Sequence, residues 1–263
     1  MNSNFDFVLF EHEPSGVSRA TAAGINSFIV DCEWRGKEER QKSADTEILP
    51  TFVQSVKIAS EIAGARIYCR INRFGPWTAA EVEDAVTFGA QRIFLPMVQT
   101  PDELEQYLRY VDRRVESAIL IETDQAVQCM ETLARLPLDA VYVGLNDLAI
   151  SRGTCSIFSA IADGTVERIR EAFPSVCFGF GGITVVDKGS PVPCKMFMKE
   201  MARLGSSFGF LRRSFRKDVT GRNMETEMWK LQELWIELLN RSDSEILADH
   251  HSLHRLIREK GLD

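Results

Sequence analysis

Acidic side chains follow several short apolar runs of this chain. Glu122 directly follows the run 118–121, Asp147 comes four residues after the run 140–143, and Asp31 and Glu33 follow the run 27–30. No His or Cys stands among the polar residues that follow the later apolar runs. Carboxylates without such softer ligands suit a hard divalent cation such as Mg or Mn. Arg70, after the run 66–69, can bind a substrate carboxylate or stabilise a developing oxyanion. Together these residues fit chemistry through an enolate.

Each of these positions also has an ordinary structural explanation. Asp147 precedes Leu148 and could cap a helix, and Thr123 could cap another helix and leave Glu122 at the surface. Arg70 could be an ion-pair partner, and the pair Gly181-Gly182 could be a turn at a strand end. Both sets of interpretations stay open at this stage.

The elements that must position these residues recur along the chain. Eight β-branched and aromatic runs, most of them separated by stretches of helical spacing, occupy residues 5–10, 27–30, 66–69, 92–95, 118–121, 140–143, 176–180 and 206–211. Regular alternation of strands and helices calls for parallel pairing, and eight units in about 250 residues predict an α/β fold, a closed (β/α)8 TIM barrel. An open doubly wound sheet is the alternative, but no G-x-G-x-x-G or P-loop Lys supports it.

Helix boundaries are marked in the sequence. Capping boxes are predicted at Thr78–Glu81 and Thr100–Glu103, the second with Pro101 at the first helical position. Apolar residues at 52, 56, 59 and 63 predict a helix that ends near Gly64.

The composition changes after the eighth run. We expect a barrel domain over residues 1–220 and extra C-terminal helices over residues 221–263, packed on the barrel or on a neighbouring subunit. The second of these helices, predicted to begin at Ser242, carries His250 and His254 one turn apart. No acidic or Cys partner stands at a fixed spacing, so we interpret the two histidines as part of a polar helix face and not as a metal site. The first of these helices, over residues 223–240, is rich in apolar residues, which predicts a homo-oligomer.

Composition excludes several function classes. The chain of 263 residues is 44% hydrophobic and 26% charged, with a net charge of −7, so the footprint of a nucleic-acid or membrane binder is missing. No apolar run is long enough for a membrane helix, and the first residues lack a signal-peptide pattern. We expect a cytoplasmic protein with no nucleic-acid or membrane partner.

The chain resembles the HpcH/HpaI aldolase and citrate lyase β-subunit superfamily, barrels of the phosphoenolpyruvate/pyruvate group, over roughly residues 5–215. The segments that carry the resemblance are 88–100 (FGAQRIFLPMVQT), 121–123 (IET) and 143–149 (VGLNDLA) followed by Gly153. It implies that Glu122 and Asp147 coordinate a divalent metal, Mg or Mn with Co also possible. It also implies that Arg70 contacts the keto or enolate oxygen, and that the backbone amides at Asn146 and Asp147 hold the substrate carboxylate.

Two positions depart from the aldolase pattern. Trp34 stands where the resemblance implies a proton-transferring His, and Leu120 stands where it implies a Gln, so the chain is in these respects more similar to the citrate lyase and malyl-CoA lyase branch. If a side-chain base is needed, Glu33 is the first candidate, Asp31 the second and His12 the third.

Basic residues at the expected rim have two interpretations. Arg35 and Lys37, in the mixed-charge segment 35–42, either close over an anionic substrate or form a solvated face. Arg212 and Arg213 stand where related chains have smaller or apolar residues, which indicates either an extra substrate anion or structural ion pairs.

The resemblance and the residues together predict a metal-dependent carbon–carbon lyase that forms or cleaves a pyruvate-like 2-oxo acid through a metal-bound enolate. One alternative is a CoA-thioester lyase of the malyl-CoA or citryl-CoA type. Another is a barrel that has lost catalysis and acts as a binding or assembly subunit. The resemblance further implies a trimer or hexamer.

Overall fold

The structure is a computed structural model that describes residues 5–35, 60–62 and 64–263. Within these residues, nine parallel strand segments form one sheet in the order β7-β6-β5-β4-β3-β2-β1-β9-β8. The segments are β1 (Asp6–Phe10), β2 (Ser27–Asp31), β3 (Arg66–Arg70), β4 (Arg92–Leu95), β5 (Glu116–Ile121), β6 (Ala140–Val143), β7 (Cys177–Phe180), β8 (Gly182–Ile183) and β9 (Phe208–Leu211).

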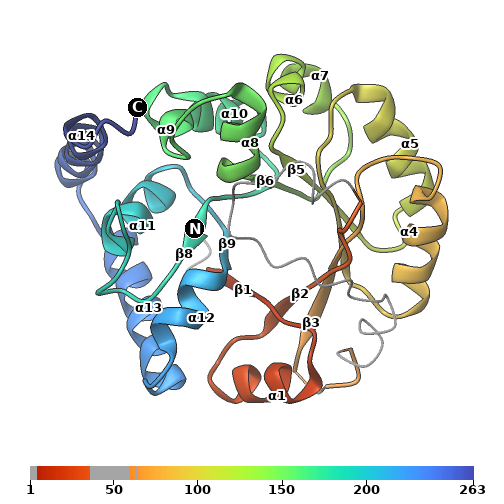
Figure 1. Ribbon diagram of the computed structural model, residues 1–263, viewed down its shortest axis with the longest axis horizontal. Coiled ribbons are helices and arrows are strands. Elements are labelled where there is room, and N and C mark those ends of the chain that lie inside the picture. The colour runs from red at the N-terminus through yellow and green to blue at the C-terminus, as the bar shows by residue number, and fades with distance from the viewer. Residues whose placement is uncertain (1–4, 36–59, 63) are drawn as a thin grey trace.

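One residue separates β7 from β8, and the two segments complete the barrel. Gly181 between them has a φ of +67°, and a Cβ there would lie 2.2 Å from the ring of Phe197, so the break needs glycine. β7 pairs with β6 and β8 pairs with β9, so the two segments together fill one strand position. The eight predicted runs therefore form the eight positions of a (β/α)8 barrel, as predicted, with helices outside it (Figure 1).

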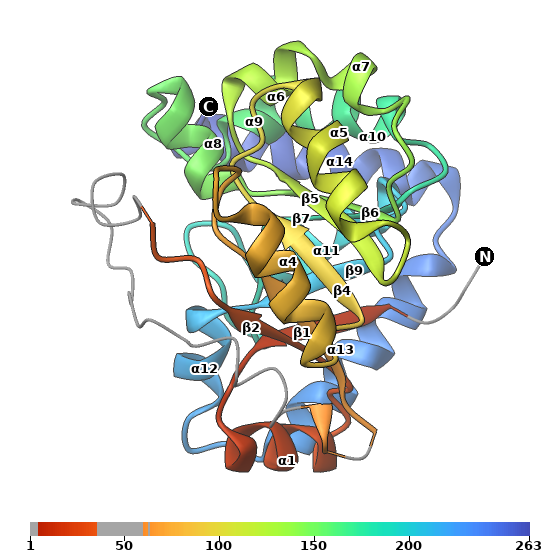
Figure 2. The same cartoon turned by 90° about the vertical axis from the view of Figure 1, so that its right-hand side faces the viewer.

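Helices follow the strands around the barrel. Figure 2 shows α4 and α5 side by side on the outer face, in front of β4. The described helices are α1 (Pro14–Ala22), α4 (Thr78–Thr87), α5 (Pro101–Val111), α6 (Asp124–Gln128), α7 (Met130–Leu133), α8 (Leu145–Arg152), α9 (Ser159–Ala162), α10 (Thr165–Ala172), α11 (Cys194–Arg203), α12 (Arg213–Val219), α13 (Met224–Leu239) and α14 (Asp243–Glu259). The helix predicted from residues 52 to 63 and the segment 36–42 lie outside the described residues.

The two predicted capping boxes have different outcomes. Thr100 accepts a hydrogen bond from the Glu103 N–H, and Glu103 accepts one from the Thr100 N–H, so this box is confirmed. The box at Thr78 is wrong, because Trp77 is the N-cap residue of α4 and the Thr78 hydroxyl accepts from the Gly75 N–H. Glu81 instead accepts hydrogen bonds from the backbone N–H and the side-chain amide of Asn72, which follows β3. Local sequence spacing does not reveal this contact.

Alternating strand residues build two apolar cores. One side chain set packs between the strands and the helices, and the other fills the barrel. Inside the barrel, the rings of Tyr142 and Phe210 stack with centroids 3.7 Å apart. At the amino ends of the strands, Arg92 lies over the ring of Tyr68 and pairs with Glu116 at 2.6 Å. The apolar barrel interior leaves the carboxyl ends of the strands as the place for a candidate active site, as is usual for barrels.

The two C-terminal helices pack on this chain in different ways. Trp235 of α13 lies against Phe5, with ring centroids 4.1 Å apart, and α13 packs against α11, so it belongs to the outer ring of helices. α14 packs across α11 and α9 on the outside (Figure 1). Both helices thus pack on the rest of this chain, and the domain boundary expected at residue 220 stays a prediction. No helix within the described ranges is long and apolar enough to cross a membrane.

Candidate active site

Arg70 is the last residue of β3 and is 2% exposed. Its Nε and Nη2 donate to the two carboxylate oxygens of Asp31, at 2.9 and 2.7 Å, and its Nη1 lies 3.2 Å from Glu33 Oε2. The neighbouring carboxylates raise the pKa of Arg70 against the opposing effect of burial. Asp31 and Glu33, both predicted site residues, therefore hold one guanidinium in a fixed orientation at the barrel mouth.

The segment after β2 is fastened to the end of β3. The side-chain oxygen of Asn72 accepts from the N–H groups of Trp34 and Arg35, at 2.9 and 2.8 Å, and its Nδ2 donates to Glu81 at 2.8 Å. The Arg35 guanidinium lies 4.3 Å from the ring centroid of Trp34 and 4.4 Å from that of Trp77. Trp34, at the position where the resemblance implies a His, is 47% exposed and stacks on Arg35.

Glu122 follows β5 and is 2% exposed, so the surface interpretation of this residue is wrong. Its Oε1 accepts from the Met97 N–H at 3.0 Å, and Met97 has a φ of +55°, a left-handed conformation that is costly for a residue other than glycine. A Cβ on Gly144 would lie 2.3 Å from Glu122 Oε2, so the bare backbone of Gly144 leaves the space that this carboxylate fills. Thr123 does cap α6, as one interpretation predicts.

Asp147 lies in the first turn of α8 and lines the same cavity as Glu122 and Asn146. Gly144, and not Asp147, is the N-cap residue of this helix. Burial, followed by the charges of Asp147 and Glu33, raises the pKa of Glu122 to about 8, and Arg70 opposes the shift. Both side chains are buried, and the negative charge of Asp147 acts on Glu122.

The charges of this region suit a divalent cation. Arg70 interacts electrostatically with Asp31, Glu33 and Glu122, and Asp147 interacts with Glu122 and with Arg212. Four carboxylates and two guanidinium groups thus share this region. A cation between Glu122 and Asp147 would relieve the repulsion that raises the pKa of Glu122, and carboxylate oxygens are ligands that Mg and Mn favour. The donor set therefore fits such an ion.

Glu122 and Asp147 line a cavity of about 230 Å³. Arg212, the residue after β9, reaches its wall, and its guanidinium carbon lies 5.0 Å from the ring centroid of Phe10. The Arg70 guanidinium lies 5.3 Å from the same centroid. Burial and the nearby Arg70 lower the pKa of Arg212. Arg213, by contrast, is exposed on α12.

Three contacts of this site were not predicted from the sequence. The Met97 N–H, the bare backbone of Gly144 and the ring of Phe10 all take part in it. The segment from Pro96 to Thr100 carries the family resemblance, but no local signal shows that its backbone turns toward β5. The third base candidate, His12, pairs with the exposed Glu13 at 3.2 Å.

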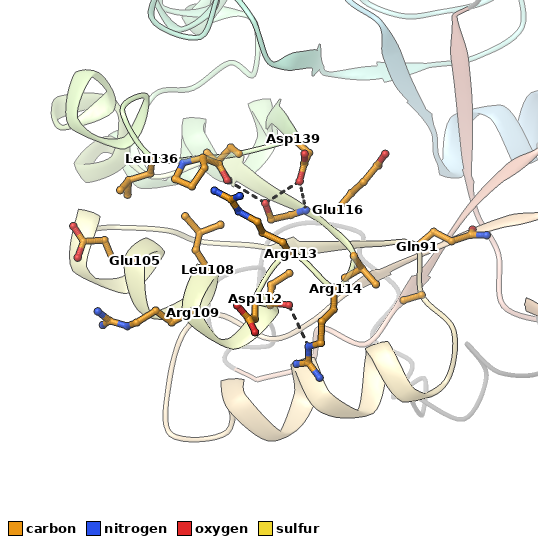
Figure 3. A pocket seen from close by; sticks show the side chains of 16 residues that line it. Gln91, Glu105, Leu108, Arg109, Asp112, Arg113, Arg114, Glu116, Leu136 and Asp139 are labelled. Atoms are coloured by element: carbon orange, nitrogen blue, oxygen red, sulfur yellow. Dashed lines mark hydrogen bonds between the residues drawn. The ribbon is translucent and has the colours of Figure 1, made fainter.

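A larger cavity lies at the opposite end of the barrel. It has a volume of about 930 Å³ and opens between α5 and the segments that precede β5 and β6 (Figure 3). Glu116 and Asp139, at the amino ends of these strands, belong to its wall together with Arg109 and Arg113. Barrel enzymes place their chemistry at the other end, so this groove is not the candidate active site.

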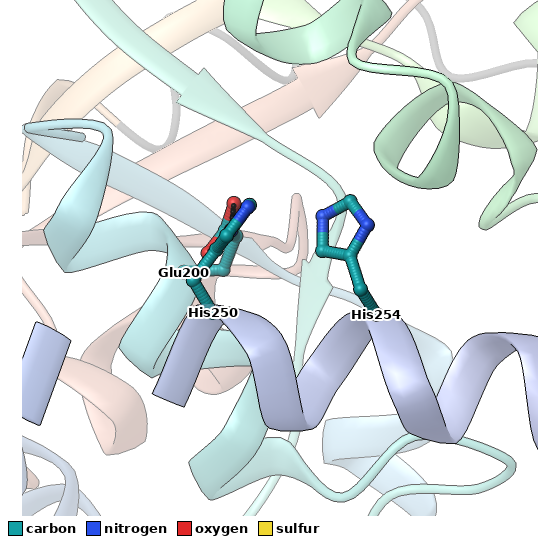
Figure 4. Close-up of side chains that lie close together, drawn as sticks. All are labelled: Glu200, His250 and His254. Carbon is teal, nitrogen blue, oxygen red and sulfur yellow. Dashed lines mark hydrogen bonds and ion pairs between the residues drawn. The ribbon is translucent and has the colours of Figure 1, made fainter. Parts of the chain in front are cut away.

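Figure 4 shows that the fold gives the two histidines of α14 an acidic neighbour. Glu200, His250 and His254 offer ligand atoms within 4.8 Å of one another, and His250 Nδ1 lies 3.2 Å from both oxygens of Glu200. Spacing along the sequence could not identify this acidic partner, because Glu200 belongs to α11 and the histidines belong to α14. Its carboxylate is already held by Arg203, with three contacts of 2.8 to 3.1 Å, which indicates a structural ion network.

The fold and the candidate site are those of a TIM-barrel protein that carries carboxylates at the carboxyl ends of its strands. Residues 7–160 match the HpcH/HpaI aldolase/citrate lyase family, more than half of the chain, and the chain belongs to this family. The family consists of lyases that generally depend on a divalent metal. No curated protein matches the chain.

Solved structures share the fold at low sequence identity. An HpcH/HpaI aldolase from Desulfitobacterium hafniense DCB-2 is 16% identical with a TM-score of 0.63, covering 83% of this chain and 91% of its own. An HpcH/HpaI aldolase/citrate lyase family protein from Burkholderia cenocepacia J2315 is 18% identical with a TM-score of 0.60, covering 88% and 95%. The citrate synthase SbnG is 15% identical with a TM-score of 0.61, again covering 88% and 95%.

Proposed function

We propose that this protein is a divalent-metal-dependent carbon–carbon lyase that forms or cleaves a pyruvate-like 2-oxo acid through its enolate. The observation that carries the proposal is the convergence of Glu122, Asp147 and the doubly held Arg70 at one mouth of the barrel. Glu122 and Asp147 would hold the metal, Mg or Mn. When bound, the metal supplies Lewis-acid stabilisation of negative charge on the substrate oxygen.

Arg70 stabilises the oxygen that becomes negative when the enolate forms. A planar guanidinium fixed by Asp31 and Glu33 needs no reorganisation as charge develops, which is the condition for strong electrostatic stabilisation. The backbone amides at Asn146 and Asp147 would hold the substrate carboxylate, as the family resemblance implies.

The contacts of Glu33 and Asp31 favour a positioning role over the proton-transfer role that the sequence suggests. Both carboxylates lie against the Arg70 guanidinium, at 3.2 and 2.7 Å, so each is already engaged in an ion pair with it. We infer that their first task is to orient Arg70. A base role for Glu33 is tested separately by its pH profile.

The test is exchange of the pyruvate C3 protons in D2O, followed by NMR with Mg or Mn and then with EDTA. Wild-type protein is compared with Glu122→Gln, which keeps an oxygen for the Met97 N–H, and with Glu131→Gln, an exposed control on α7. We expect metal-dependent exchange that Glu122→Gln loses and Glu131→Gln retains. The proposal is overturned if no condition supports exchange.

Two alternatives would then replace it. Cleavage of malyl-CoA or citryl-CoA, measured by release of free CoA or acetyl-CoA, would assign the protein to the thioester lyases. Failure to bind Mg or Mn in a calorimetric titration, with no activity on either substrate class, would support the binding or assembly subunit.

A further inference from the structure

The last helix, α14, is attached to the rest of the chain by few apolar side chains. Of its 17 residues, Leu253 and Ile257 are the ones that are buried, while Leu247 is 55% exposed. The helix nevertheless packs along α11 and α9. Two aliphatic side chains are a small apolar contact for a helix of this length, so polar contacts with α11 must contribute to its attachment.

Glu200, His250 and His254 lie where α14 meets α11. The ring centroids of the two histidines are 4.2 Å apart, and both rings project from the same side of α14 (Figure 4). The ligand atoms of the three side chains lie within 4.8 Å of one another. Ligand atoms around a tetrahedral zinc ion are about 3.4 Å apart. Because both imidazoles are only half-buried, small side-chain rotations would bring the three groups to that spacing.

The charges of these side chains and their neighbours favour a cation. Arg203 contacts both Glu200 and Glu167, at 2.8 Å each, so one guanidinium faces two carboxylates and these three groups together carry one negative charge. Burial, followed by the neighbouring His250, lowers the pKa of His254, so its ring nitrogens stay available to a metal ion. A divalent cation would therefore meet negative charge and a neutral imidazole.

Arg203 fixes the Glu200 carboxylate without occupying all of it. Its Nε lies 3.1 Å from both carboxylate oxygens, and its Nη2 lies 2.8 Å from Oε1. A carboxylate has about four lone-pair positions, so Glu200 can accept from Arg203 and still bind a metal ion. Carboxylate ligands of metal ions are usually held by a further hydrogen bond that orients them, and Arg203 supplies this contact.

We propose that Glu200, His250 and His254 bind a zinc ion that fastens α14 to α11, with water as the fourth ligand. Two imidazoles and one carboxylate suit Zn²⁺, whereas Mg and Mn favour sets of oxygen ligands such as the one at the barrel mouth. The zinc ion has a structural role, because it joins two helices on the outside of the barrel. The inference does not rest on the proposed function.

The experiment is a calorimetric titration of zinc into the whole chain after treatment with EDTA and removal of the chelator. Wild type is compared with His250→Gln and His254→Gln, which each remove one ligand, and with the matched control His251→Gln, whose ring is exposed on the same helix. Every titration is repeated in the Glu122→Gln background, so that zinc at the candidate active site is not counted. The Tm of each variant in EDTA verifies that it is folded without the ion.

In the Glu122→Gln background we expect one zinc ion per chain and a higher Tm with zinc than with EDTA. Each ligand variant should bind this ion at least about 100-fold more weakly, since the loss of a mere supporting contact already costs about 10- to 100-fold. The zinc-dependent rise in Tm should disappear in both ligand variants and persist in His251→Gln. Cu²⁺ bound at the same site should show splitting from two nitrogen ligands in its electron paramagnetic resonance spectrum.

Two results overturn the inference. One is the absence of zinc binding in the Glu122→Gln background. The other is an unchanged zinc affinity and an unchanged rise in Tm in folded His250→Gln or His254→Gln, because the ion then lies elsewhere. Pyruvate proton exchange decides the proposed function separately, since neither zinc affinity nor Tm requires turnover.

Discussion

Arg70 Nε and Nη2 bind both oxygens of Asp31, at 2.9 and 2.7 Å, so the carboxyl ends of β2 and β3 are joined by a two-point ion pair. Asp31 and Arg70 are also paired in register across these strands, which explains why the contact forms. The barrel backbone thus brings the two side chains together, and their planar groups fix the direction in which the remaining face of the guanidinium points.

Arg70→Lys should lower the rate of pyruvate proton exchange by about 100-fold or more, because an ammonium group cannot keep the two-point contact with Asp31 or the planar face toward the substrate. Metal affinity should change far less, since Arg70 is not a proposed ligand. NMR exchange and calorimetry on one preparation measure both quantities. An exchange rate within threefold of wild type would exclude Arg70 from enolate formation.

Glu33→Gln should lower turnover while leaving metal affinity nearly intact. If Glu33 only orients Arg70, the pH profile of the variant keeps the shape of the wild-type profile at a lower rate. The reason is that the group whose titration shapes the profile is then a residue other than Glu33, which the substitution leaves in place. Loss of the acidic limb would instead identify Glu33 as the base. Wild-type turnover in Glu33→Gln would remove the residue from the mechanism.

Metal affinity should depend on pH through Glu122. Its pKa is raised to about 8 in the metal-free protein, so a bound proton must leave before the carboxylate can hold a cation. Affinity for Mn should therefore rise by up to about tenfold per pH unit below pH 8 and level off above it. Calorimetric titrations from pH 6 to 9 measure this slope, and a flat profile over that range would contradict the assignment.

The same shift affects the stability of the metal-free protein. The pKa of Glu122 rises on folding from 4.5, so the folded state holds more protons than the unfolded state and stability falls as pH increases from about 5 to 8. Glu122→Gln should weaken this decline, as measured by Tm in EDTA. An equal decline in the variant would show that other groups cause it.

Gly144→Ala should disturb the metal site without removing a ligand. The added Cβ would lie 2.3 Å from Glu122 Oε2 and 2.9 Å from Glu122 Cβ, so the carboxylate must move. We expect metal affinity to fall by about tenfold or more, the scale at which supporting contacts tune metal sites. Gly153→Ala is a control, since a Cβ there meets nothing within 4 Å, although its φ of +67° adds some strain.

Glu200→Gln should destabilise the fold by about 2–3 kcal/mol, because Arg203 and His250 lose a buried charged partner. Glu237→Gln, which removes an exposed partner of Lys195, should cost less than about 0.5 kcal/mol. Urea unfolding measures both changes. Pyruvate exchange should persist in Glu200→Gln, and its loss would indicate that the cluster on α11 and α14 matters for catalysis.

Oligomeric assembly stays a prediction. Trp229 and Ile236 of α13 are 58% and 48% exposed and lie two helical turns apart, on one face. Gel filtration with light scattering should give a multiple of 29.7 kDa, and Trp229→Glu should shift it toward one chain. A wild-type mass of one chain would contradict the prediction.

The sequence by itself determined the barrel and the positions from which its site is built. Strand runs, the Thr100 box and the polar residues at strand ends depend on local periodicity and on the parallel order of βα units, so they can be read along the chain. For the same reason Arg70, Glu122 and Asp147 could be placed at one end before any contact was known.

Only the tertiary structure decided what each side chain touches. The Met97 N–H binds Glu122 across 25 residues, Glu81 binds Asn72 instead of its own helix start, and Glu200 reaches His250 across 50. Such contacts depend on how strands and helices pack in three dimensions, and local residue preferences carry no information about them.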